Sequence, residues 1–217
     1  MATACTTSAL EVRRLGRVPY ADALALQEEL RAALGAGEGA ETILLLEHPD
    51  VVTYGRSAKP GNTLFGEDAL RALGYDVFRV NRGGDVTWHG PGQLVGYPIL
   101  DLARRGSDVH RYIRTLERAL IDAVADFGVV ARQREGFAGV WLDERRKLAS
   151  IGVGLRAWRT IHGFALNVCC DLERSRVIVP CGLAGVEMTS LESATGRGVD
   201  LEEVTARVED ALRKAFA

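Results

Sequence analysis

The glycine-rich stretch from Arg82 to Pro98 constrains this chain more than any other part of it. It reads RGGDVTWHGPGQLVGYP and contains five glycines and two prolines. Each glycine inside a helix or strand costs about 0.5–1 kcal/mol relative to alanine, so glycines this dense indicate positive φ angles or a close approach of the backbone to another group. Between the glycines stand polar and aromatic side chains that could orient a substrate. The stretch therefore predicts a binding loop between two strands, with a plain long turn as the alternative.

Length and composition predict one soluble globular domain that covers residues 1–217. Hydrophobic residues make up 47% of the chain and charged residues 26%, which are usual values for such a protein. No apolar run approaches the roughly 20 residues of a membrane-spanning helix. Residues 1–13 have no apolar segment typical of a secretion signal, and we expect a flexible tail there. Four cysteines without a CxxC spacing favour a reducing, cytoplasmic setting over a disulfide framework.

The charged residues are unevenly distributed along the chain. The net charge is −2, which disfavours nucleic acid or a membrane surface as the main partner. Residues 79–176, the basic segment, nevertheless hold 16 Lys and Arg against 11 Asp and Glu. Arginine pairs occur in it at 104–105 and 145–146. Most such charges are simply solvated, but an acidic partner protein would be attracted to this segment.

Two long helices are predicted from the spacing of their apolar residues. Residues 20–34 are apolar at helical intervals until two glycines interrupt the pattern. Residues 108–127 carry a continuous apolar stripe, and Asp108 is suited to cap the N-terminus of that helix. A short helix over 67–73 and a C-terminal helix capped by Asp200 complete the helical elements.

The strand-like segments predict the fold class. They arrive in adjacent pairs more often than in strict alternation with helices, which predicts an α+β fold with a mixed, largely antiparallel sheet and packed helices. Pro98, inside the strongest of these segments, indicates an edge strand or a bulge. The segments are TILLLEH, VVTYG, YDVFRV, QLVGYPILDL, VVARQ, AGVWLD, LASIGVGL and TIHGFALNV.

Cys181 is the first candidate for covalent chemistry. It follows a short apolar run and Pro180, and it precedes Gly182. A thiol where a strand gives way to a loop, beside a small neighbour, would be approachable. The alternative is a structural role, because most free cysteines are buried and inert.

Lys147 is the second candidate, since it stands directly before the small-residue strand LASIGVGL. A lysine at such a place is usually a surface charge. Beside a thiol in a water-poor site, however, it would stabilise the thiolate or take its proton. His89 and His162 compete for the role of base, and neither has a metal-ligand spacing. The sequence has no GxxxxGK[ST] phosphate loop, no GxSxG elbow and no paired carboxylates.

Four blocks of sequence together resemble the lipoyl(octanoyl) transferases, the lipoate-protein ligase B family. The blocks are EHPDVVTYGR, the glycine-rich stretch extended to ILDL, RRKLASIGVG with the later HGFALNV, and PCGLAGVEMTS, and they span about Glu47 to Leu191. The second block is long enough to be highly specific. The fourth contains the PCG cysteine of that family, and Lys147 has the position of its catalytic lysine.

The resemblance implies the fold shared by the catalytic domains of biotin protein ligases and lipoate ligases. It also implies an acyltransferase that moves an octanoyl or lipoyl group from acyl carrier protein to a lysine of lipoyl domains. The acceptors would be the E2 subunits of 2-oxoacid dehydrogenases and the glycine cleavage H protein, in the first step of protein lipoylation. Cys181 would carry the acyl group as a thioester and Lys147 would activate the thiol, with no cofactor, metal or ATP required.

The resemblance further implies which residues line the acyl pocket. They are Arg82, Gly83, Gly84, Asp85, Val86, Thr87, Trp88, His89, Ser150, Ile151, Gly152, Gly163, Phe164 and Ala165. Eight buried carbons would contribute on the order of 5 kcal/mol at about 0.8 kcal/mol per methylene, which is enough to select chain length.

Two rival functions remain open at this point. One is an ATP-dependent lipoate or biotin ligase of the same fold, which would not need Cys181. The other is a non-catalytic module that binds carrier proteins, in which Cys181 is structural. Only the combination of Lys147 with Cys181 argues against the second.

Overall fold

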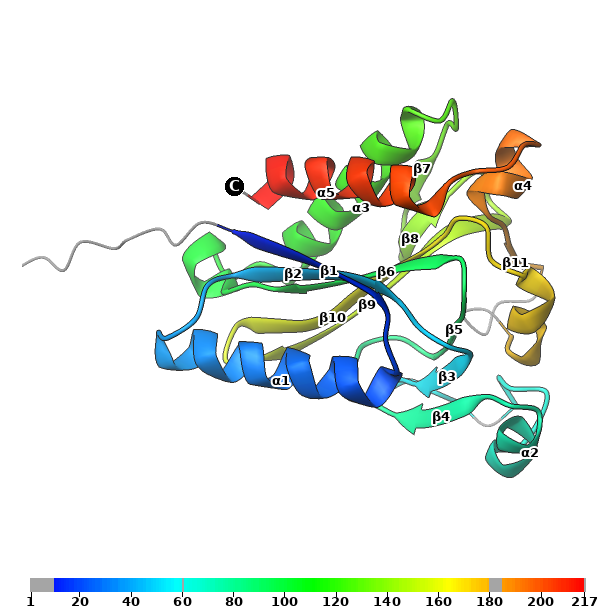
Figure 1. Ribbon diagram of the computed structural model, residues 1–217, viewed down its shortest axis with the longest axis horizontal. Coiled ribbons are helices and arrows are strands. Elements are labelled where there is room, and N and C mark those ends of the chain that lie inside the picture. The colour runs from blue at the N-terminus through cyan, green and yellow to red at the C-terminus, as the bar shows by residue number, and fades with distance from the viewer. Residues whose placement is uncertain (1–9, 60, 180–184, 217) are drawn as a thin grey trace, which may run out of the picture.

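The main sheet forms the centre of the molecule (Figure 1). The computed structural model describes residues 10–59, 61–179 and 185–216. The strand order is β1–β2–β6–β10–β9–β8–β7, and β11 pairs with β9 beside this path. Among the described residues of this main sheet, only the β1–β2 and β9–β11 pairs are parallel, which confirms the mixed, largely antiparallel sheet. The strands are β1 (Glu11–Arg17), β2 (Thr42–Glu47), β6 (Gln93–Ile99), β7 (Arg132–Arg134), β8 (Phe137–Trp141), β9 (Arg146–Arg156), β10 (Arg159–Asn167) and β11 (Glu187–Met188).

A second, three-stranded sheet lies beside one end of the main sheet (Figure 1). Its order is β4 (Asp76–Arg79), β3 (Val51–Tyr54) and β5 (Val86–His89), with β3 parallel to β4 and antiparallel to β5. It has an apolar cluster of its own, to which β5 contributes Trp88 and the segment after β10 contributes Ile178. The glycine-rich stretch therefore contains β5 and β6, and its turn carries the chain from the small sheet into the main one.

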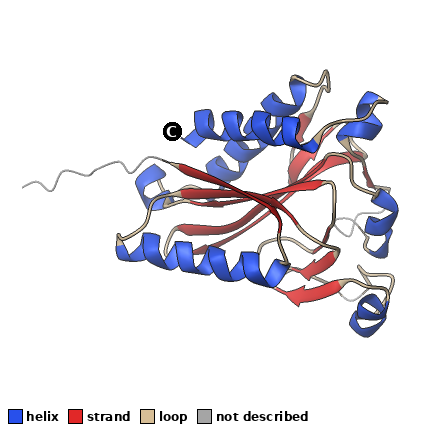
Figure 2. Ribbon diagram, viewed as in Figure 1, coloured by secondary structure: helices blue, strands red, loops and turns tan. Residues whose placement is uncertain are grey.

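Helices cover both faces of the main sheet (Figures 1 and 2). The alternation in β2 explains this arrangement: Ile43 and Leu45 belong to the apolar core under α3 and α5, whereas Leu44 and Leu46 belong to the core under α1. None of the helices in the described ranges has the length and apolar character needed to span a bilayer. The helices are α1 (Tyr20–Ala36), α2 (Glu67–Ala72), α3 (Val109–Ala125), α4 (Leu191–Thr195) and α5 (Leu201–Phe216), with 3₁₀ turns η1 (Leu102–Arg105) and η2 (Leu172–Val177).

The helix predicted over 108–127 is confirmed as α3, and its cap is formed as expected. The Asp108 side chain accepts a hydrogen bond from the Arg111 backbone N–H at 2.9 Å. One polar residue, Glu117, lies fully buried on the apolar side of the helix. Its carboxylate accepts hydrogen bonds from the backbone N–H of Gly139 at 2.9 Å and from Arg114 at 2.7 Å. The buried charge is therefore paired, as burial of a carboxylate requires.

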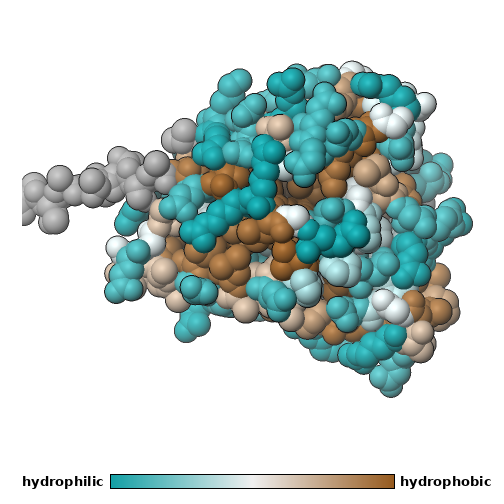
Figure 3. Space-filling model, in the orientation of Figure 1, coloured by the Kyte–Doolittle hydropathy of each residue, from teal (hydrophilic) through white to brown (hydrophobic). Residues whose placement is uncertain are grey.

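The flexible tail expected over residues 1–13 is wrong for residues 11–13, which belong to a strand. Residues 11–13 begin β1, which pairs with β2 in parallel, while residues 1–9 lie outside the described part of the chain. β1 is an edge strand and carries Arg13, Arg14 and Arg17. Figure 3 shows hydrophilic residues lying across apolar surface on this side of the molecule. Charged side chains on an edge strand oppose pairing with a second chain.

The prediction that Pro98 marks an edge strand is wrong. β6 lies between β2 and β10 in the middle of the main sheet. Its register with β10 covers only residues 93–96, so Pro98, which has no N–H, lies beyond the end of that ladder. The Thr160 hydroxyl donates to the Pro98 carbonyl oxygen at 2.6 Å. The proline therefore interrupts the strand pairing on one side only.

Candidate active site

A pocket of about 340 Å³ opens between the small sheet and the main sheet. β5 supplies Thr87 and Trp88, and β9 supplies Lys147, Ser150 and Ile151. A narrow recess of about 30 Å³ shares some of the same walls and is closed by residues of β6 and β10. The other predicted residues that line one or both spaces are Arg82, Gly84, Asp85, Val86, His89, Gly152, Gly163, Phe164 and Ala165.

Gly83 is the predicted binding residue that lines neither space. Its backbone N–H donates to the Val153 carbonyl oxygen at 2.8 Å, which ties the loop to β9. A Cβ atom on Gly152 would lie 3.0 Å from the Gly83 carbonyl oxygen, so the two backbones approach closely here. Glycine at 152 permits that approach, which explains part of the glycine density in the sequence.

Lys147 is only 3% exposed and belongs to the pocket wall. Its Nζ atom lies 5.1 Å from the centre of the Trp141 ring, a distance at which an ammonium group is attracted to the ring face. The expectation of a surface lysine, which was the simpler alternative, is therefore wrong. β9 and its neighbour β8 hold the amine inside the pocket, where it could exchange a proton with a substrate or a thiol.

Cys181 lies outside the described residues. The chain on either side of it reaches the pocket, because Ile178 and Met188 both line it. Met188 is paired with Lys147 in the short parallel ladder between β11 and β9. The two described cysteines are poor candidates for a nucleophile: burial raises the pKa of Cys170 to about 12 and also raises the pKa of Cys169.

Arg82 is buried and holds the glycine-rich loop to β3. Its guanidinium donates to the Thr53 carbonyl oxygen at 2.7 Å and to the Thr53 hydroxyl at 2.9 Å. It also donates to the Gly83 carbonyl oxygen at 3.1 Å. A buried guanidinium with several acceptors is fixed in place, so it supplies a positive charge to both the pocket and the recess.

Asp85 and Trp88, two other predicted binding residues, are also held by hydrogen bonds within the protein. The Asp85 carboxylate accepts from the Val86 backbone N–H at 2.8 Å and from the Asn62 side chain. The Trp88 indole donates to Asp50 at 2.9 Å. Both side chains therefore stabilise the pocket wall in addition to lining it.

Two histidines line the recess and a third contacts one of them, and each of the three is kept neutral near pH 7. Burial lowers the pKa of His48 to about 4 and that of His162 to about 4, and burial together with His48 lowers the pKa of His89 to about 3. His89 and His162 line the recess, while His48 lies behind it and stacks edge-on to His89. Such low pKa values make His89 and His162 weak bases at neutral pH, which favours Lys147 among the proposed bases.

Sequence reasoning missed the pair formed by His48 and Tyr97. His48 Nδ1 lies 2.7 Å from the Val18 carbonyl oxygen, so this nitrogen carries the proton. His48 Nε2 must then accept the hydrogen bond from the Tyr97 hydroxyl, also at 2.7 Å. Tyr97 and Tyr20 both line the recess. The first of the four sequence blocks contained His48, but nothing in its spacing linked it to Tyr97.

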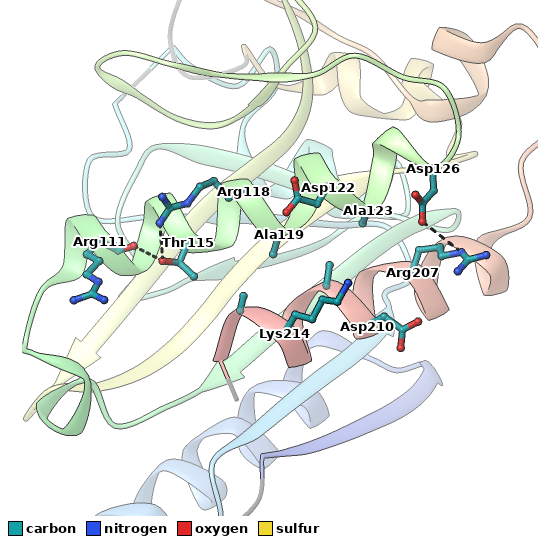
Figure 4. Close-up of a pocket in the computed structure, with 12 residues that line it drawn as sticks. Arg111, Thr115, Arg118, Ala119, Asp122, Ala123, Asp126, Arg207, Asp210 and Lys214 are labelled. Atoms are coloured by element: carbon teal, nitrogen blue, oxygen red, sulfur yellow. Dashed lines mark hydrogen bonds and ion pairs between the residues drawn. The ribbon is translucent and has the colours of Figure 1, made fainter.

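A larger hollow, of about 690 Å³, lies on the face of the main sheet that α3 and α5 cover, and Figure 4 shows the residues that line it. It lies between α3 and α5 and is lined by charged side chains such as Arg118, Asp122 and Lys214, with Arg207 3.7 Å from Asp126. None of the predicted site residues lines it. Within the described parts of the chain, no group of three or more His, Cys, Asp or Glu could hold a metal ion.

Comparison with known proteins gives the family. The chain matches the lipoyl protein ligase A/B catalytic domain over residues 19–213. It is 55% identical to an octanoyltransferase of Geotalea uraniireducens over 89% of this chain and 87% of the relative. It is 52% identical to an octanoyltransferase of Syntrophotalea carbinolica over 92% of this chain and 90% of the relative.

Solved structures with the same fold include lipoate and biotin ligases. A lipoate-protein ligase A bound with ATP superposes with a TM-score of 0.73 at 16% identity, over 96% of this chain and 85% of that one. A biotin protein ligase from Aquifex aeolicus superposes with a TM-score of 0.53 at 14% identity, over 97% of this chain and 69% of that one. These likenesses confirm the expected fold. The chain belongs to the lipoyl protein ligase A/B catalytic domain family and, within it, to the octanoyltransferases.

Proposed function

We propose that the protein transfers an octanoyl group from acyl carrier protein to a lysine of lipoyl domains, through a thioester on Cys181. The observation that carries this proposal is the buried amine of Lys147 in the wall of a pocket that also contains the glycine-rich stretch. The family supports the octanoyl substrate, since the relatives are octanoyltransferases. The pocket volume of about 340 Å³ falls in the range of small-molecule sites.

The first half of the reaction forms the acyl-enzyme. The Cys181 thiolate attacks the carbonyl carbon of the octanoyl thioester, a new C–S bond forms, and the C–S bond to the carrier breaks. The carrier leaves as a thiolate and takes a proton from the Lys147 ammonium group, which becomes the free amine. Lys147, as an ammonium group, would stabilise the attacking thiolate.

The second half moves the acyl group to nitrogen. The amine of the acceptor lysine attacks the Cys181 thioester, a C–N bond forms, and the C–S bond breaks. Lys147, once deprotonated, takes the proton that the acceptor amine loses, and the Cys181 thiolate is regenerated. Conversion of a thioester to an amide lowers the free energy, so this route needs no ATP.

The acyl chain would extend from the pocket into the recess. Apolar and small residues make up much of that path, among them Ile151, Phe164 and Ala165. Each methylene buried there would stabilise the complex by about 0.8 kcal/mol. The glycines on the same path, Gly152 and Gly163, let neighbouring backbones approach the wall closely: a Cβ at 163 would collide with the Gly96 carbonyl oxygen, and one at 152 would lie 3.0 Å from the Gly83 carbonyl oxygen.

The test is mass spectrometry after incubation with octanoyl-carrier protein in the absence of ATP. The peptide that contains Cys181 should gain the mass of one octanoyl group, and addition of a lipoyl domain should remove it. Cys181→Ser should abolish transfer, whereas Cys169→Ser should leave it intact as a matched control. If acylation requires free octanoate and ATP, the protein is a ligase instead. If the carrier protein binds but no acyl-enzyme forms, it is a binding module.

A further inference from the structure

A line of buried amide groups runs from the recess to the strand beside Lys147. Gln93 and Asn167 lie opposite each other on β6 and β10. Gln93 Oε1 lies 2.8 Å from His89 Nδ1, and Gln93 Nε2 donates to Asn167 Oδ1 at 2.9 Å and, over a longer distance of 3.4 Å, to the Trp88 carbonyl oxygen. Asn167 Nδ2 donates to the Thr189 carbonyl oxygen at 2.9 Å. We call Gln93, Asn167 and the Thr189 carbonyl the amide chain.

The amide chain has only one orientation that satisfies every group. The Thr189 carbonyl can only accept, so Asn167 must present its NH₂ group to it and its oxygen to Gln93. Gln93 must then donate to Asn167, and its oxygen faces His89. His89 Nδ1 therefore carries the proton, and Nε2 is left as an acceptor. His89, Gln93, Asn167 and Thr189 are each at most 8% exposed, so they depend on one another for these hydrogen bonds.

The other end of the amide chain is fixed to β9. The Thr189 backbone N–H donates to the Lys147 carbonyl oxygen at 2.9 Å. Met188, the residue before it, is paired with Lys147 in the parallel ladder and lines the pocket. β11 is only two residues long, so the ladder alone gives this segment few hydrogen bonds. The bond from Asn167 adds a buried one at its end.

We propose that Gln93 and Asn167 are positioning residues. Their hydrogen bonds hold His89 as the Nδ1-protonated tautomer and, through the Thr189 carbonyl, hold residues 188–189 in place beside Lys147. The proposal rests on the proposed function, because it assigns these residues a part in octanoyl transfer. Neither residue is given a chemical step.

The surroundings of His89 agree with this assignment. The titratable groups that face the ring are His48, Tyr20, Arg82 and His162. Burial, His48, Arg82 and His162 all lower its pKa, so the ring is neutral and must choose between two tautomers. A neutral ring with Nε2 unprotonated supplies the recess with an acceptor and no positive charge.

The tautomer can be read by ¹⁵N NMR of protein labelled at histidine. The wild-type His89 signals should be those of a single Nδ1–H form near neutral pH. Gln93→Met, which keeps the side-chain length but removes all three side-chain hydrogen bonds of Gln93, should give a mixture of tautomers. Asn167→Ala should also give a mixture, although Asn167 does not contact His89, because it leaves the Gln93 NH₂ group with only its long hydrogen bond to the Trp88 carbonyl oxygen. It should in addition accelerate hydrogen exchange of the Thr189 amide.

Activity provides the second measurement. Loss of one buried partner in the amide chain should lower kcat about tenfold, with a smaller change in KM, because Asn167 lines neither space and Gln93→Met keeps the length of a side chain that lines the pocket. Gln133→Met is the matched control. Gln133 also donates to a backbone carbonyl, that of Arg114 at 3.1 Å, but it lines neither pocket nor recess. It should keep the wild-type tautomer and kcat.

Each outcome decides the proposal. A folded Gln93→Met variant that keeps the single Nδ1–H tautomer, or that keeps wild-type kcat, overturns it. If Asn167→Ala does not fold, the Gln93→Met measurements decide alone. If the wild-type protein transfers no octanoyl group, the proposed function fails. The NMR and exchange experiments then still show whether the amide chain sets the tautomer, but its assigned role in transfer falls with the function.

Discussion

Gly139 lies against the side chain of Lys147. A Cβ atom at position 139 would lie 2.7 Å from Lys147 Cε and 2.5 Å from the Ala149 carbonyl oxygen. Gly139 also has a φ of +136°, a conformation that residues with side chains rarely adopt. Because Gly139 on β8 has no side chain, the Lys147 amine can occupy its buried position beside it.

Gly139→Ala should consequently displace Lys147. We expect a loss of about 1–3 kcal/mol in the free energy of unfolding from backbone strain, and a larger proportional loss of octanoyl transfer. Gly128→Ala is the control, because Gly128 also has a positive φ but no atom within 4 Å of the added Cβ. It should lose stability and keep its activity. Equal activity in the two variants, measured at matched folded concentration, would contradict this account of Gly139.

Substitutions of Lys147 should separate its charge from its basicity. Lys147→Arg keeps a positive charge but removes the usable base, so Cys181 should still react quickly with an alkylating agent while transfer to the acceptor amine is lost. Lys147→Met removes both properties and should slow both reactions. Alkylation is followed by mass spectrometry of the Cys181 peptide, since Cys169 and Cys170 have raised pKa values and should react slowly. Wild-type alkylation in Lys147→Met would exclude activation of Cys181 by Lys147.

The periodic parts of the fold could be predicted from the sequence. The stripe in α3 and the alternation in β2 follow from residues close together in the chain, so their spacing was sufficient. The environment of Lys147 could not be predicted, because Trp141 and Gly139 reach it through the pairing of β8 with β9. The position of Pro98 in a central strand depends in the same way on a distant residue, Thr160.

In the candidate site, too, features encoded by neighbouring residues could be predicted, whereas those that depend on distant residues could not. The glycine-rich stretch and the strand after Lys147 could be assigned to one site only through their resemblance to a known family, and in the structure residues of both line one pocket. The link from His89 through Gln93 to Asn167 spans 74 residues between the two amides, and each amide alone looks like an ordinary polar strand residue. A buried polar side chain is informative only when its partner is known.

The basic segment predicts that docking of an acidic carrier protein would depend on salt. Arg145 is exposed, next but one to Lys147, and its guanidinium donates to the Gly185 carbonyl oxygen at 3.2 Å. Arg145→Glu should raise KM for octanoyl-carrier protein about fivefold, equivalent to about 1 kcal/mol, with less change in kcat. The KM of the wild-type enzyme should also rise with salt, because exposed charges are screened over about 8 Å at physiological ionic strength.

Arg118→Glu is the matched control for charge reversal. Arg118 is exposed on α3, in the hollow on the opposite face of the main sheet. Arg118 also belongs to the basic segment, so its reversal tests whether KM for the carrier protein depends on the net charge of the protein or on the position of the charge. If both reversals raise KM equally, attraction is a property of the whole molecule. If neither does and KM is independent of salt, electrostatic docking is excluded.

The neutral histidines predict a loss of stability in acid. His48, His89 and His162 have pKa values of about 4, 3 and 4 in the folded protein, against about 6.5 in an unfolded chain. Below pH 6.5 the unfolded state therefore binds more protons than the folded state, and the free energy of unfolding falls as pH decreases toward 4. Each histidine contributes up to about 1.4 kcal/mol per pH unit in this window and nothing above it.

Urea unfolding at pH 7, 6 and 5 measures this slope. His48→Gln should reduce the slope of the free energy of unfolding against pH by the contribution of one histidine, up to about 1.4 kcal/mol per pH unit. This holds whatever the substitution does to stability at pH 7. His110→Gln is the control, since His110 is exposed on α3 and should leave the slope unchanged. The slope of the free energy of unfolding against pH is proportional to the number of protons taken up on unfolding, whereas the stability at one pH is not. An unchanged slope in His48→Gln would mean that His48 takes up its proton over the same pH range in the folded and the unfolded protein, which would contradict the lowering of its pKa by burial.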